Sequence, residues 1–557
     1  RQRQMCIRDR SIREEFQKHE KRLLFLILAL CIIISFSPST LAANLPEVDV
    51  RTEGLTPAQP QEAPAEKPRD AGAERRTIYV SNEGTEEDDG ATAETPTTLA
   101  RATELANEGK KPVEIVVLGQ VSVDTWTSPT VETTLRGGDE NAELLFEYCS
   151  ASDGAYNISL ADALTIDEIK FNCNYTDYFF SRYYGTYTIV ANGYPLVIAS
   201  GVQYSYYTAD TIVDGKTCST SSCYVIGGGL DEDITGGTHV EIYTSLPLTY
   251  VYGGGVNGSV ESNVYLHIEN CGKIQHVRAG GYANKKDAKV NGNITLDFIN
   301  SVTDNPIYGG GYARSSYSAE VTGSICINLS GLNNGFGRPI YGGGYGKNAP
   351  VVGNITFNIS NTKMNNNAAA IYGGGYDSDV TGDIFIHIKE NSLISEETVW
   401  GGGTGDSTIT GGVTITVDDS SEVIGEIRAG GNEGADVIGD VVITVSGGPQ
   451  SACPTIFATG KGEDEDNPAQ VDGNVSITLH GSRANVYTLD KFGEVTSDHT
   501  VTIILDDTDE LSGAVRGDSK LDQHLYNHEK DNPTRTGNGA SVIVKGDYTS
   551  TCLLYTS

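Results

Sequence analysis

The sequence predicts an all-β fold in which similar coils stack into a β-solenoid, preceded by a short N-terminal helix. Three observations lead to this prediction. A glycine-rich motif recurs about every thirty residues, each copy is followed by alternating apolar and polar residues, and the first folded segment runs strand, helix, strand. Repetition at such a period is typical of stacked supersecondary units with loops of variable length.

The glycine motif is clearest in Ile340–Tyr345, where an apolar residue and a tyrosine precede three glycines. The residue directly before the glycines recurs at intervals of 26 to 33 positions. A propeller would need units of about 40–45 residues with four strands each, so a solenoid fits better. Three consecutive glycines indicate a tight corner or a close approach of two backbones. The other copies are Val225–Gly229, Val251–Gly255, Ile307–Gly311, Ile371–Gly375 and Val399–Gly403, with looser copies at Arg278–Gly281 and Arg428–Gly431.

Each glycine motif is followed by a segment such as Val351–Ile359, in which apolar residues alternate with mostly polar ones. This period of two predicts a strand with one buried face, and the β-branched inward residues suit a packed sheet. A lone coil cannot offset the backbone entropy of ordering about thirty residues, so the coils are expected to stack. Equivalent segments are Val290–Phe298, Val321–Leu329, Val380–Ile388, Ile409–Val417, Val437–Val445 and Val471–Leu479.

The folded part is expected to begin with a strand at Thr77–Asn82 and an acidic loop at Glu83–Gly90. Pro96–Ala106 then predicts a short helix, and Val113–Leu118 a second strand. One face of the helix is apolar, which predicts that this face is buried. The residues of that face are Leu99, Ala102, Leu105 and Ala106.

The segment Tyr79–Ala106, YVSNEGTEEDDGATAETPTTLARATELA, closely resembles the N-terminal cap of secreted bacterial right-handed parallel β-helix proteins of the pectin-lyase-like superfold. Leu164–Asn172 and Ile189–Val202 also look like coils of that family. The resemblance implies a right-handed parallel β-helix with a capping helix. It implies no single activity, because adhesins, lyases, hydrolases and epimerases share this fold.

Composition divides the chain into segments before and after the repeats. Residues 11–43 are predicted to be a signal peptide, because Lys18, Lys21 and Arg22 precede the apolar run Leu23–Phe36. That run is shorter than the ~20 residues that span a bilayer, so cleavage is expected and the mature chain should have no transmembrane span. The remaining predicted segments are a disordered Pro/Glu/Ala-rich spacer (44–76), the cap (77–120), irregular first coils (121–224), the glycine-motif repeats (225–548), and two ends that resemble sequencing-adapter read-through (1–10 and 549–557).

The formal net charge of −35 excludes nucleic acid as a partner and leaves room for divalent cations. Two acidic loops, Glu463–Asn467 and Asp377–Asp379, make Ca²⁺ a candidate ligand. They lack the spacing of known calcium loops, so solvated loops are the favoured interpretation, and no metal site or cofactor is predicted. There is no CxxC pair that would indicate zinc.

An outward-facing column of the repeated strands would place Glu241, His267 and Asp297 side by side on three successive coils. A histidine between two carboxylates can act as a general base, so these three residues are the catalytic candidates. The alternative is a solvated polar stripe, which any half-buried strand presents.

The aromatic residues before the glycines form a second column, and they are the candidate ligand-binding residues, because an exposed row of rings suits the flat faces of sugars. These residues are Tyr252, Tyr308, Tyr341, Tyr372 and Trp400. The alternative, which we favour, is that the rings stack on one another and stabilise the coil wall. Arg278 and Arg428 are candidate bases for a lyase, but no fixed aspartate cluster accompanies them.

These features favour a monomeric secreted or surface-displayed protein, an adhesin-like or glycan-binding stalk whose partner is a polysaccharide or a host cell-surface glycan. The competing hypothesis is a polysaccharide lyase or glycoside hydrolase of the same superfold. An enzyme of this kind would need a cleft, and the irregular, tyrosine-rich segment Tyr175–Cys223 is where one would be expected.

Overall fold

The computed structural model describes residues 75–146, 156–173, 186–204 and 222–506, the last range with gaps of one to six residues, and five short strand segments elsewhere. The predicted signal peptide and almost all of the predicted spacer lie outside these residues, as do residues 1–10 and most of 549–557. About half of Tyr175–Cys223, in four separate stretches, also lies outside them. The predictions for these segments therefore stay predictions.

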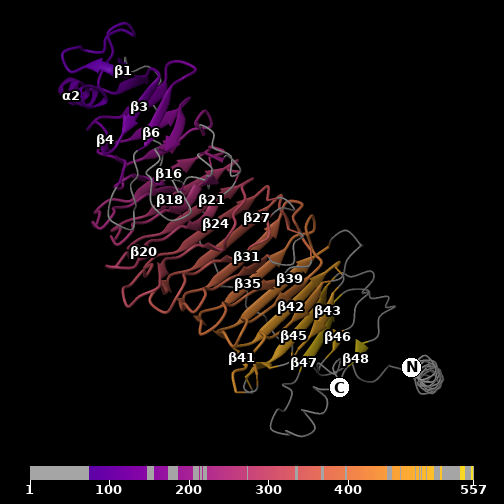
Figure 1. Cartoon of the computed structure of the whole chain (residues 1–557). Coiled ribbons are helices and arrows are strands. Elements are labelled where there is room, and N and C mark those ends of the chain that lie inside the picture. Colours follow the sequence, from indigo (N-terminus) through magenta and orange to yellow (C-terminus); the bar gives the residue numbers. More distant parts are fainter. Residues whose placement is uncertain are drawn as a thin grey trace, which may run out of the picture. The chain divides into compact units, whose positions relative to one another are not determined.

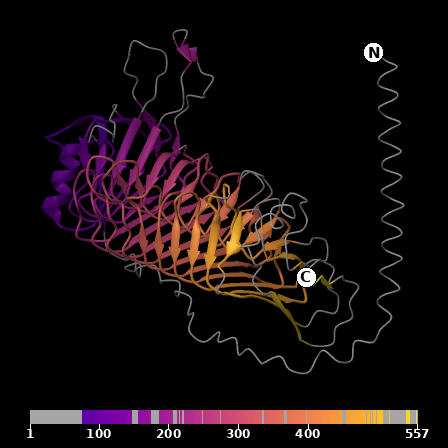
Figure 2. The same ribbon diagram turned by 90° about the horizontal axis from the view of Figure 1, so that it is seen from below.

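The described residues form a parallel β-solenoid, which confirms the predicted fold class. Figures 1 and 2 show its strands stacked in sequence order from the N-terminal helix toward the C-terminal strands. The largest sheet has sixteen strands, all paired in parallel. They are β1 (Arg76–Thr85), β2 (Val113–Val117), β5 (Thr133–Gly137), β8 (Leu164–Asp167), β11 (Leu196–Ile198), β16 (Thr238–Ile242), β18 (Val264–Glu269), β21 (Ile294–Ile299), β24 (Ile325–Ser330), β27 (Ile355–Ser360), β31 (Ile384–Lys389), β35 (Val413–Val417), β39 (Val441–Ser446), β42 (Val475–His480), β45 (Val501–Asp506) and β47 (Ala540–Lys545).

A second parallel sheet of fifteen strands contains the residues that precede the glycines. Its strands are β4 (Trp126–Thr127), β7 (Ile158–Ser159), β10 (Thr186–Val190), β15 (Ser222–Ile226), β17 (Leu248–Tyr252), β19 (Ile274–Arg278), β22 (Ile307–Tyr308), β25 (Ile340–Tyr341), β29 (Ala370–Tyr372), β33 (Thr398–Trp400), β37 (Glu426–Arg428), β40 (Thr455–Phe457), β43 (Asn485–Tyr487), β46 (Val515–Arg516) and β48 (Leu554–Tyr555).

Smaller sheets complete the coils. A six-stranded sheet contains β26 (Val351–Val352), β30 (Val380–Thr381), β34 (Thr408–Thr410), β38 (Asp436–Ile438), β41 (Ala469–Asp472) and β44 (Gly493–Val495). The others contain β3 (Gln120–Val123), β6 (Glu143–Phe146), β9 (Lys170–Cys173) and β12 (Gln203–Tyr204); β28 (Lys363–Met364), β32 (Leu393–Ile394) and β36 (Glu422–Val423); β20 (Tyr282–Ala283) and β23 (Tyr312–Ala313); and the antiparallel pair β13 (Ile212–Val213) and β14 (Lys216–Thr217).

The segment Val351–Ile359, which the sequence indicates as one strand, is two strands in the structure. It breaks at Gly353, whose φ is +157°, a conformation that residues with a side chain rarely adopt. A Cβ on Gly353 would lie 2.5 Å from the backbone of Gly323 in the preceding coil. The chain therefore turns here from the six-stranded sheet into the sixteen-stranded sheet, and a coil has a third short strand.

The three glycines of the motif allow neighbouring coils to approach closely, as the sequence predicts. The amide of Gly310 donates to the carbonyl of Gly343, and the amide of Gly343 donates to that of Gly374, at 3.0 and 3.1 Å. A Cβ on Gly343 would lie 2.8 Å from the amide nitrogen of Gly375. Any larger residue at this position would push the coils apart.

The solenoid core consists of the inward side chains of successive coils, and Ile355, Phe357 and Ile359 are fully buried, as the period of two predicts. The predicted helix is α2 (Leu99–Gly109), which lies beside β1 at the N-terminal end of the solenoid (Figure 1). The Thr98 hydroxyl caps it by accepting a hydrogen bond from the amide of Arg101. Its buried face is the predicted one, Leu99, Ala102, Leu105 and Ala106. No helix within the described residues combines the length and apolarity needed to cross a bilayer.

Candidate functional site

The outward column predicted along the sixteen-stranded sheet is confirmed residue by residue. Glu241 pairs with His267, and His267 pairs with Asp297, so the three candidates do lie on adjacent strands. The column continues in register through Asn328, Asn358, His387, Thr416, Thr444 and Thr478.

Side-chain contacts divide the three candidates into two groups. The carboxylate of Glu241 contacts His239 Nε2 at 2.6 Å and accepts a hydrogen bond from the Tyr243 hydroxyl at 2.9 Å. His267 contacts Asp297 Oδ2 through Nδ1 at 3.3 Å and Glu269 Oε2 through Nε2 at 3.2 Å. His267 therefore does lie between two carboxylates, but the second is Glu269 on its own strand and not Glu241.

These contacts favour a charged histidine. Burial lowers the pKa of His267, but the hydrogen bonds to Asp297 and Glu269 outweigh burial and leave this pKa above its ordinary value. Burial raises the pKa of Asp297, but hydrogen bonds from His267, Asn328 and Tyr265 leave it below its usual range. A general base needs a neutral imidazole with a free nitrogen, whereas both nitrogens of His267 contact carboxylates. The geometry is that of an ion-pair network, and the catalytic role stays a prediction.

The aromatic column before the glycines is almost completely buried. The exposed fraction is 3% for Tyr252, 8% for Tyr308, 5% for Tyr341, 9% for Tyr372 and 5% for Trp400. From Tyr308 onward the rings stack face to face on neighbouring coils, with centroids 5.1, 4.8 and 5.8 Å apart. A second column, Tyr312, Tyr345 and Tyr376, stacks beside the first and meets it edge to face. We call the seven residues of these two stacks the aromatic ladder: Tyr308, Tyr341, Tyr372 and Trp400 in the first, and Tyr312, Tyr345 and Tyr376 in the second.

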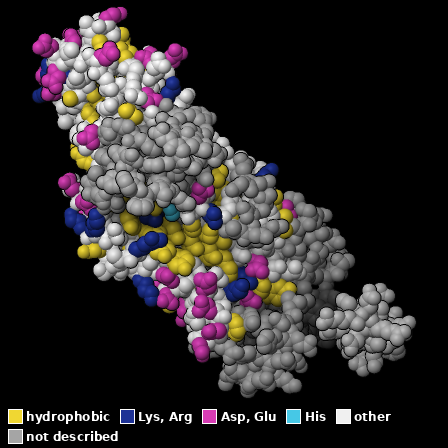
Figure 3. Space-filling model, viewed as in Figure 1, with side chains coloured by type: hydrophobic (Ala, Val, Ile, Leu, Met, Phe, Trp, Pro, Cys, Tyr) yellow, Lys and Arg dark blue, Asp and Glu magenta, His cyan; other side chains and the backbone are white. Residues whose placement is uncertain are grey.

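The ladder therefore contributes mainly to packing between coils. Stacked and edge-to-face pairs of this kind each contribute about 0.5–1.5 kcal/mol beyond the area they bury. Figure 3 shows hydrophobic side chains gathered on one face near the position of β20, with Lys, Arg, Asp and Glu side chains around them.

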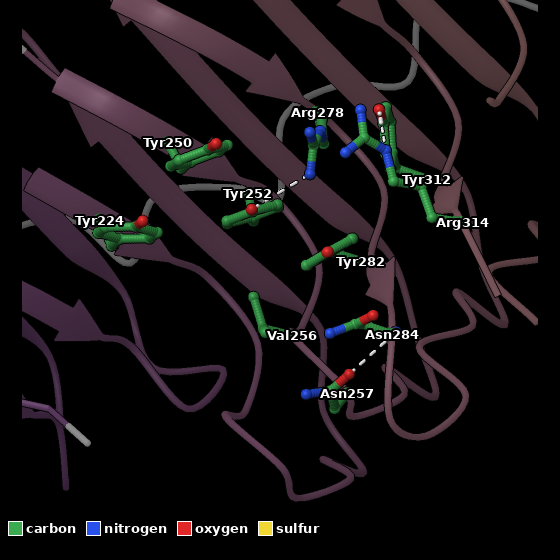
Figure 4. A pocket seen from close by; sticks show the side chains of 10 residues that line it. All are labelled: Tyr224, Tyr250, Tyr252, Val256, Asn257, Arg278, Tyr282, Asn284, Tyr312 and Arg314. Carbon is green, nitrogen blue, oxygen red and sulfur yellow. Dashed lines mark hydrogen bonds between the residues drawn. The ribbon is translucent and has the colours of Figure 1, made fainter. Parts of the chain in front are cut away.

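A pocket of about 200 Å³ opens where this ladder meets the coils that precede it (Figure 4). One wall consists of near-parallel rings. The angle between the ring planes is 1° for Tyr250 and Tyr252 and 13° for Tyr252 and Tyr282. We call it the Arg278 pocket; its lining residues are Tyr224, Tyr250, Tyr252, Val256, Asn257, Arg278, Tyr282, Asn284, Tyr312 and Arg314.

Arg278 occupies the position of the column that tyrosine occupies in the two adjacent coils, between Tyr252 and Tyr308. Only 5% of the residue is exposed. Its guanidinium carbon lies 3.5 Å from the centre of the Tyr312 ring, and Nη1 donates to the Tyr252 hydroxyl at 3.2 Å. Nε is buried without a hydrogen-bond partner, and none of the contacts of Arg278 with described residues is to a carboxylate.

Two neighbours extend the positive end of the pocket. Arg314 is exposed, and its Nε donates to the Tyr312 hydroxyl at 3.0 Å, so both guanidinium groups lie beside the same ring (Figure 4). His276 stacks on Tyr250 with ring centroids 4.5 Å apart. Burial and the positive charges of Arg278 and Arg314 lower the pKa of His276 to about 4, so this ring is neutral at neutral pH.

The acidic loops considered for Ca²⁺ use their carboxylates within the fold. Asp377 and Asp379 accept hydrogen bonds from the amides of Asp406 and Thr408 in the next coil. Asp464 accepts from the amides of Asp466 and Asn467 in its own loop. Across the described residues, no group of three or more His, Cys, Asp or Glu side chains is arranged to hold a metal ion.

The sequence predicts ligand binding at Tyr252 and makes Arg278 only a candidate base, and it does not predict a pocket. It contains one signal for the site. Arg278 interrupts a column of aromatic residues, and a charged residue at a position where the fold buries its neighbours is a functional-site signal.

The fold and register place this chain in the class of parallel β-helix proteins. Comparison with protein-family models, with curated proteins and with solved structures finds no match.

Proposed function

We propose that the chain is a glycan-binding β-helix of the adhesin type and that the Arg278 pocket is its binding site. The observation that carries the proposal is a pocket whose wall is a row of parallel tyrosine rings and whose end holds a buried arginine. Ligand pockets combine an apolar, largely aromatic lining with a few polar groups that fix orientation.

The polar groups at the pocket suit hydroxyl-rich ligands. The hydroxyls of Tyr250 and Tyr282 and the side-chain amide of Asn284 make no hydrogen bonds with the described residues. Tyrosine hydroxyls and amides both donate and accept, and sugar hydroxyls need partners of both kinds. In this proposal the flat rings contact the sugar faces, while these groups bind the sugar hydroxyls.

The proposal includes export, on the basis of the predicted signal peptide at residues 11–43 and the spacer at 44–76. A rigid solenoid after a spacer suits display of a binding site away from a cell envelope. The partner is then a polysaccharide or a cell-surface glycan, and no nucleic acid is expected for a chain of net charge −35.

The competing function is a polysaccharide lyase or glycoside hydrolase. Its catalytic groups would be Glu241, His267 and Asp297, or Arg278 as the base of a lyase. The contacts of His267 with two carboxylates disfavour the first set. The second set uses the same pocket, so a measurement of cleavage is needed to separate the two functions.

The test is a panel of polysaccharides incubated with the full chain and assayed both for binding and for new reducing or unsaturated ends. Binding without new ends is expected. New ends that increase with time would overturn the adhesin-type proposal in favour of the enzyme, and binding to no member of the panel would overturn both.

Two matched variants test the location of the site. Tyr282 and Tyr376 occupy the same position of their coils and both are half-buried, but only Tyr282 lines the pocket. Tyr282→Ala is expected to weaken glycan binding at least tenfold, whereas Tyr376→Ala should leave it within about twofold. Equal effects of the two variants would place the binding site elsewhere.

A further inference from the structure

The unusual feature of the Arg278 pocket is a buried positive charge that the described residues do not neutralise. Transfer of a charged group out of water costs several kcal/mol unless a partner compensates it. Stacking on Tyr312 offsets part of this cost, because the face of an aromatic ring attracts a desolvated cation. Nε nevertheless keeps a buried N–H without an acceptor.

The same solenoid contains a counterpart in which this charge is neutralised. Arg428 occupies the equivalent position, with 4% exposure and its guanidinium carbon 3.9 Å from the Phe457 ring. There Nε donates to Glu426 at 2.8 Å and Nη1 donates to Asp490. The position two residues before the arginine holds Glu426 in that coil and His276 in the coil of Arg278. Among the described residues, Arg278 therefore lacks a carboxylate partner because of its own neighbours and not because of the fold.

We propose that the Arg278 pocket binds one anionic sugar residue of a glycan, with the guanidinium groups of Arg278 and Arg314 as the groups that recognise the anion. This inference rests on the proposed glycan-binding function. A carboxylate or sulfate beside Arg278 would form short charge-assisted hydrogen bonds, which are about twice as strong as neutral ones. It would also supply the counter-charge that Glu426 and Asp490 supply to Arg428.

Pocket size and the charge of the whole chain limit the ligand further. A pocket of about 200 Å³ lies below the ~300–1,000 Å³ typical of drug-sized ligands, so it suits a single ring. Elsewhere a net charge of −35 repels anionic polymers, so their recognition requires a local cationic site. His276 is neutral near pH 7. Arg278 and Arg314 are therefore the charged groups among the residues that line the pocket.

The test uses two pairs of probes with the full chain. The first pair is a polymer of glucuronic acid and the same polymer after reduction of its carboxyl groups to alcohols. The second pair is a sulfated galactan and its desulfated form. We expect the acidic member of at least one pair to bind at least tenfold more tightly than its neutral form, and the pair that shows the preference identifies the anion.

Variants connect this preference to the pocket. Arg278→Gln is expected to remove it, and Arg314→Gln to reduce it at least threefold. Arg338→Gln, which removes one charge from an exposed residue outside the pocket, should leave it unchanged. If Arg278→Gln fails to fold, Arg278→Lys replaces it, because lysine keeps the charge but loses the planar fork, and a reduced preference is again expected.

The outcomes separate this inference from the proposed function. Equal binding of acidic and neutral forms by the unmodified chain, or an unchanged preference in Arg278→Gln, would overturn the anionic subsite and leave glycan binding intact. If no polymer binds, the proposed function fails. The unfolding temperature in sodium glucuronate and in sodium sulfate then tests whether the pocket binds an anion. An increase that depends on Arg278 would support the anion site, and no increase would overturn it as well.

Discussion

The coils of Arg278 and Arg428 place an arginine at the same position of the same sheet, but the surroundings of the two guanidinium groups differ. Both arginines are at least 95% buried, and both lie against an aromatic ring. Arg428 is held by two carboxylates, whereas Arg278 lines a pocket. The backbone of the repeat therefore fixes where an arginine lies, and its neighbours decide whether it is part of the wall or a binding group.

Two residues, one nearby in the sequence and one distant, determine whether the arginine is paired with carboxylates. The local one is position 276 or 426, two residues before the arginine and on the same side of the strand. The distant one is Asp490, which follows Arg428 by 62 residues and reaches it across two coils. A solenoid with a fixed coil path can thus open or close a site by changes that leave its core unaffected.

The largest effect is expected from removal of each arginine. Arg428→Met should lower the free energy of unfolding by about 3 kcal/mol, because it leaves the mostly buried carboxylate of Asp490 without its partner. The loss of unfolding free energy in Arg278→Met should be smaller than that in Arg428→Met by about 1 kcal/mol or more. The reason is that the removed charge has no carboxylate partner among the described residues, so no buried carboxylate is left unpaired. Urea unfolding followed by circular dichroism measures both, and equal losses would contradict the distinction between the two coils.

The next test converts one coil into the other. His276→Glu should place a carboxylate next to Nε of Arg278, as Glu426 lies next to Nε of Arg428. We expect loss of any anion preference and a gain in stability of about 1 kcal/mol, the range of a partly exposed ion pair. His276→Gln, which adds no charge, is the control. Retention of anion binding in His276→Glu would show that the pocket does not depend on the free charge of Arg278.

The pH dependence of stability at His276 offers a separate test. The folded protein holds the pKa of this ring near 4, whereas the unfolded chain has about 6.5, so the unfolded state binds more protons between these values. Stability should therefore fall as the pH decreases from 6.5 to 4, by about 1–2 kcal/mol after allowance for the partial exposure of the ring. The groups that act on this ring are Arg278, Arg314 and Asp304.

The measurement is the unfolding temperature of the unmodified chain and of His276→Gln between pH 4 and pH 8. The variant should lose less stability on acidification. Parallel curves for the two proteins would show that His276 does not carry the effect.

A pH dependence of opposite sign to that of His276 is expected at His267. Its pKa in the folded protein lies above the value in the unfolded chain, so its ion pairs stabilise the fold fully below pH ~6.5 and cease to do so as the pH rises through the folded value. His267→Gln should therefore be less stable than the unmodified chain at pH 6, by about 1 kcal/mol, and nearly equal to it at pH 9. A difference that grows with pH would contradict the ion-pair network.

The sequence by itself determined the features that depend on local patterning. Inward positions such as Ile355 and Phe357, the buried face of α2, and the register of the column through His267 all follow from periods of two and 3.6 residues. Such patterns are visible in a single chain because each strand or helix must bury its own apolar face. The close approach of backbones at Gly343 was predictable for the same reason, since only glycine permits it.

Only the tertiary structure decided which of the outward residues contact each other. The partners of His267, the burial of the aromatic ladder and the pairing of Arg428 with Asp490 depend on side-chain directions across neighbouring coils. The loops between coils differ in length, so spacing along the chain does not specify these contacts. Arg278 and Arg428 look alike in the sequence because both precede Ala-Gly-Gly. They differ in the structure because, among the described residues, only Arg428 is hydrogen-bonded to carboxylates.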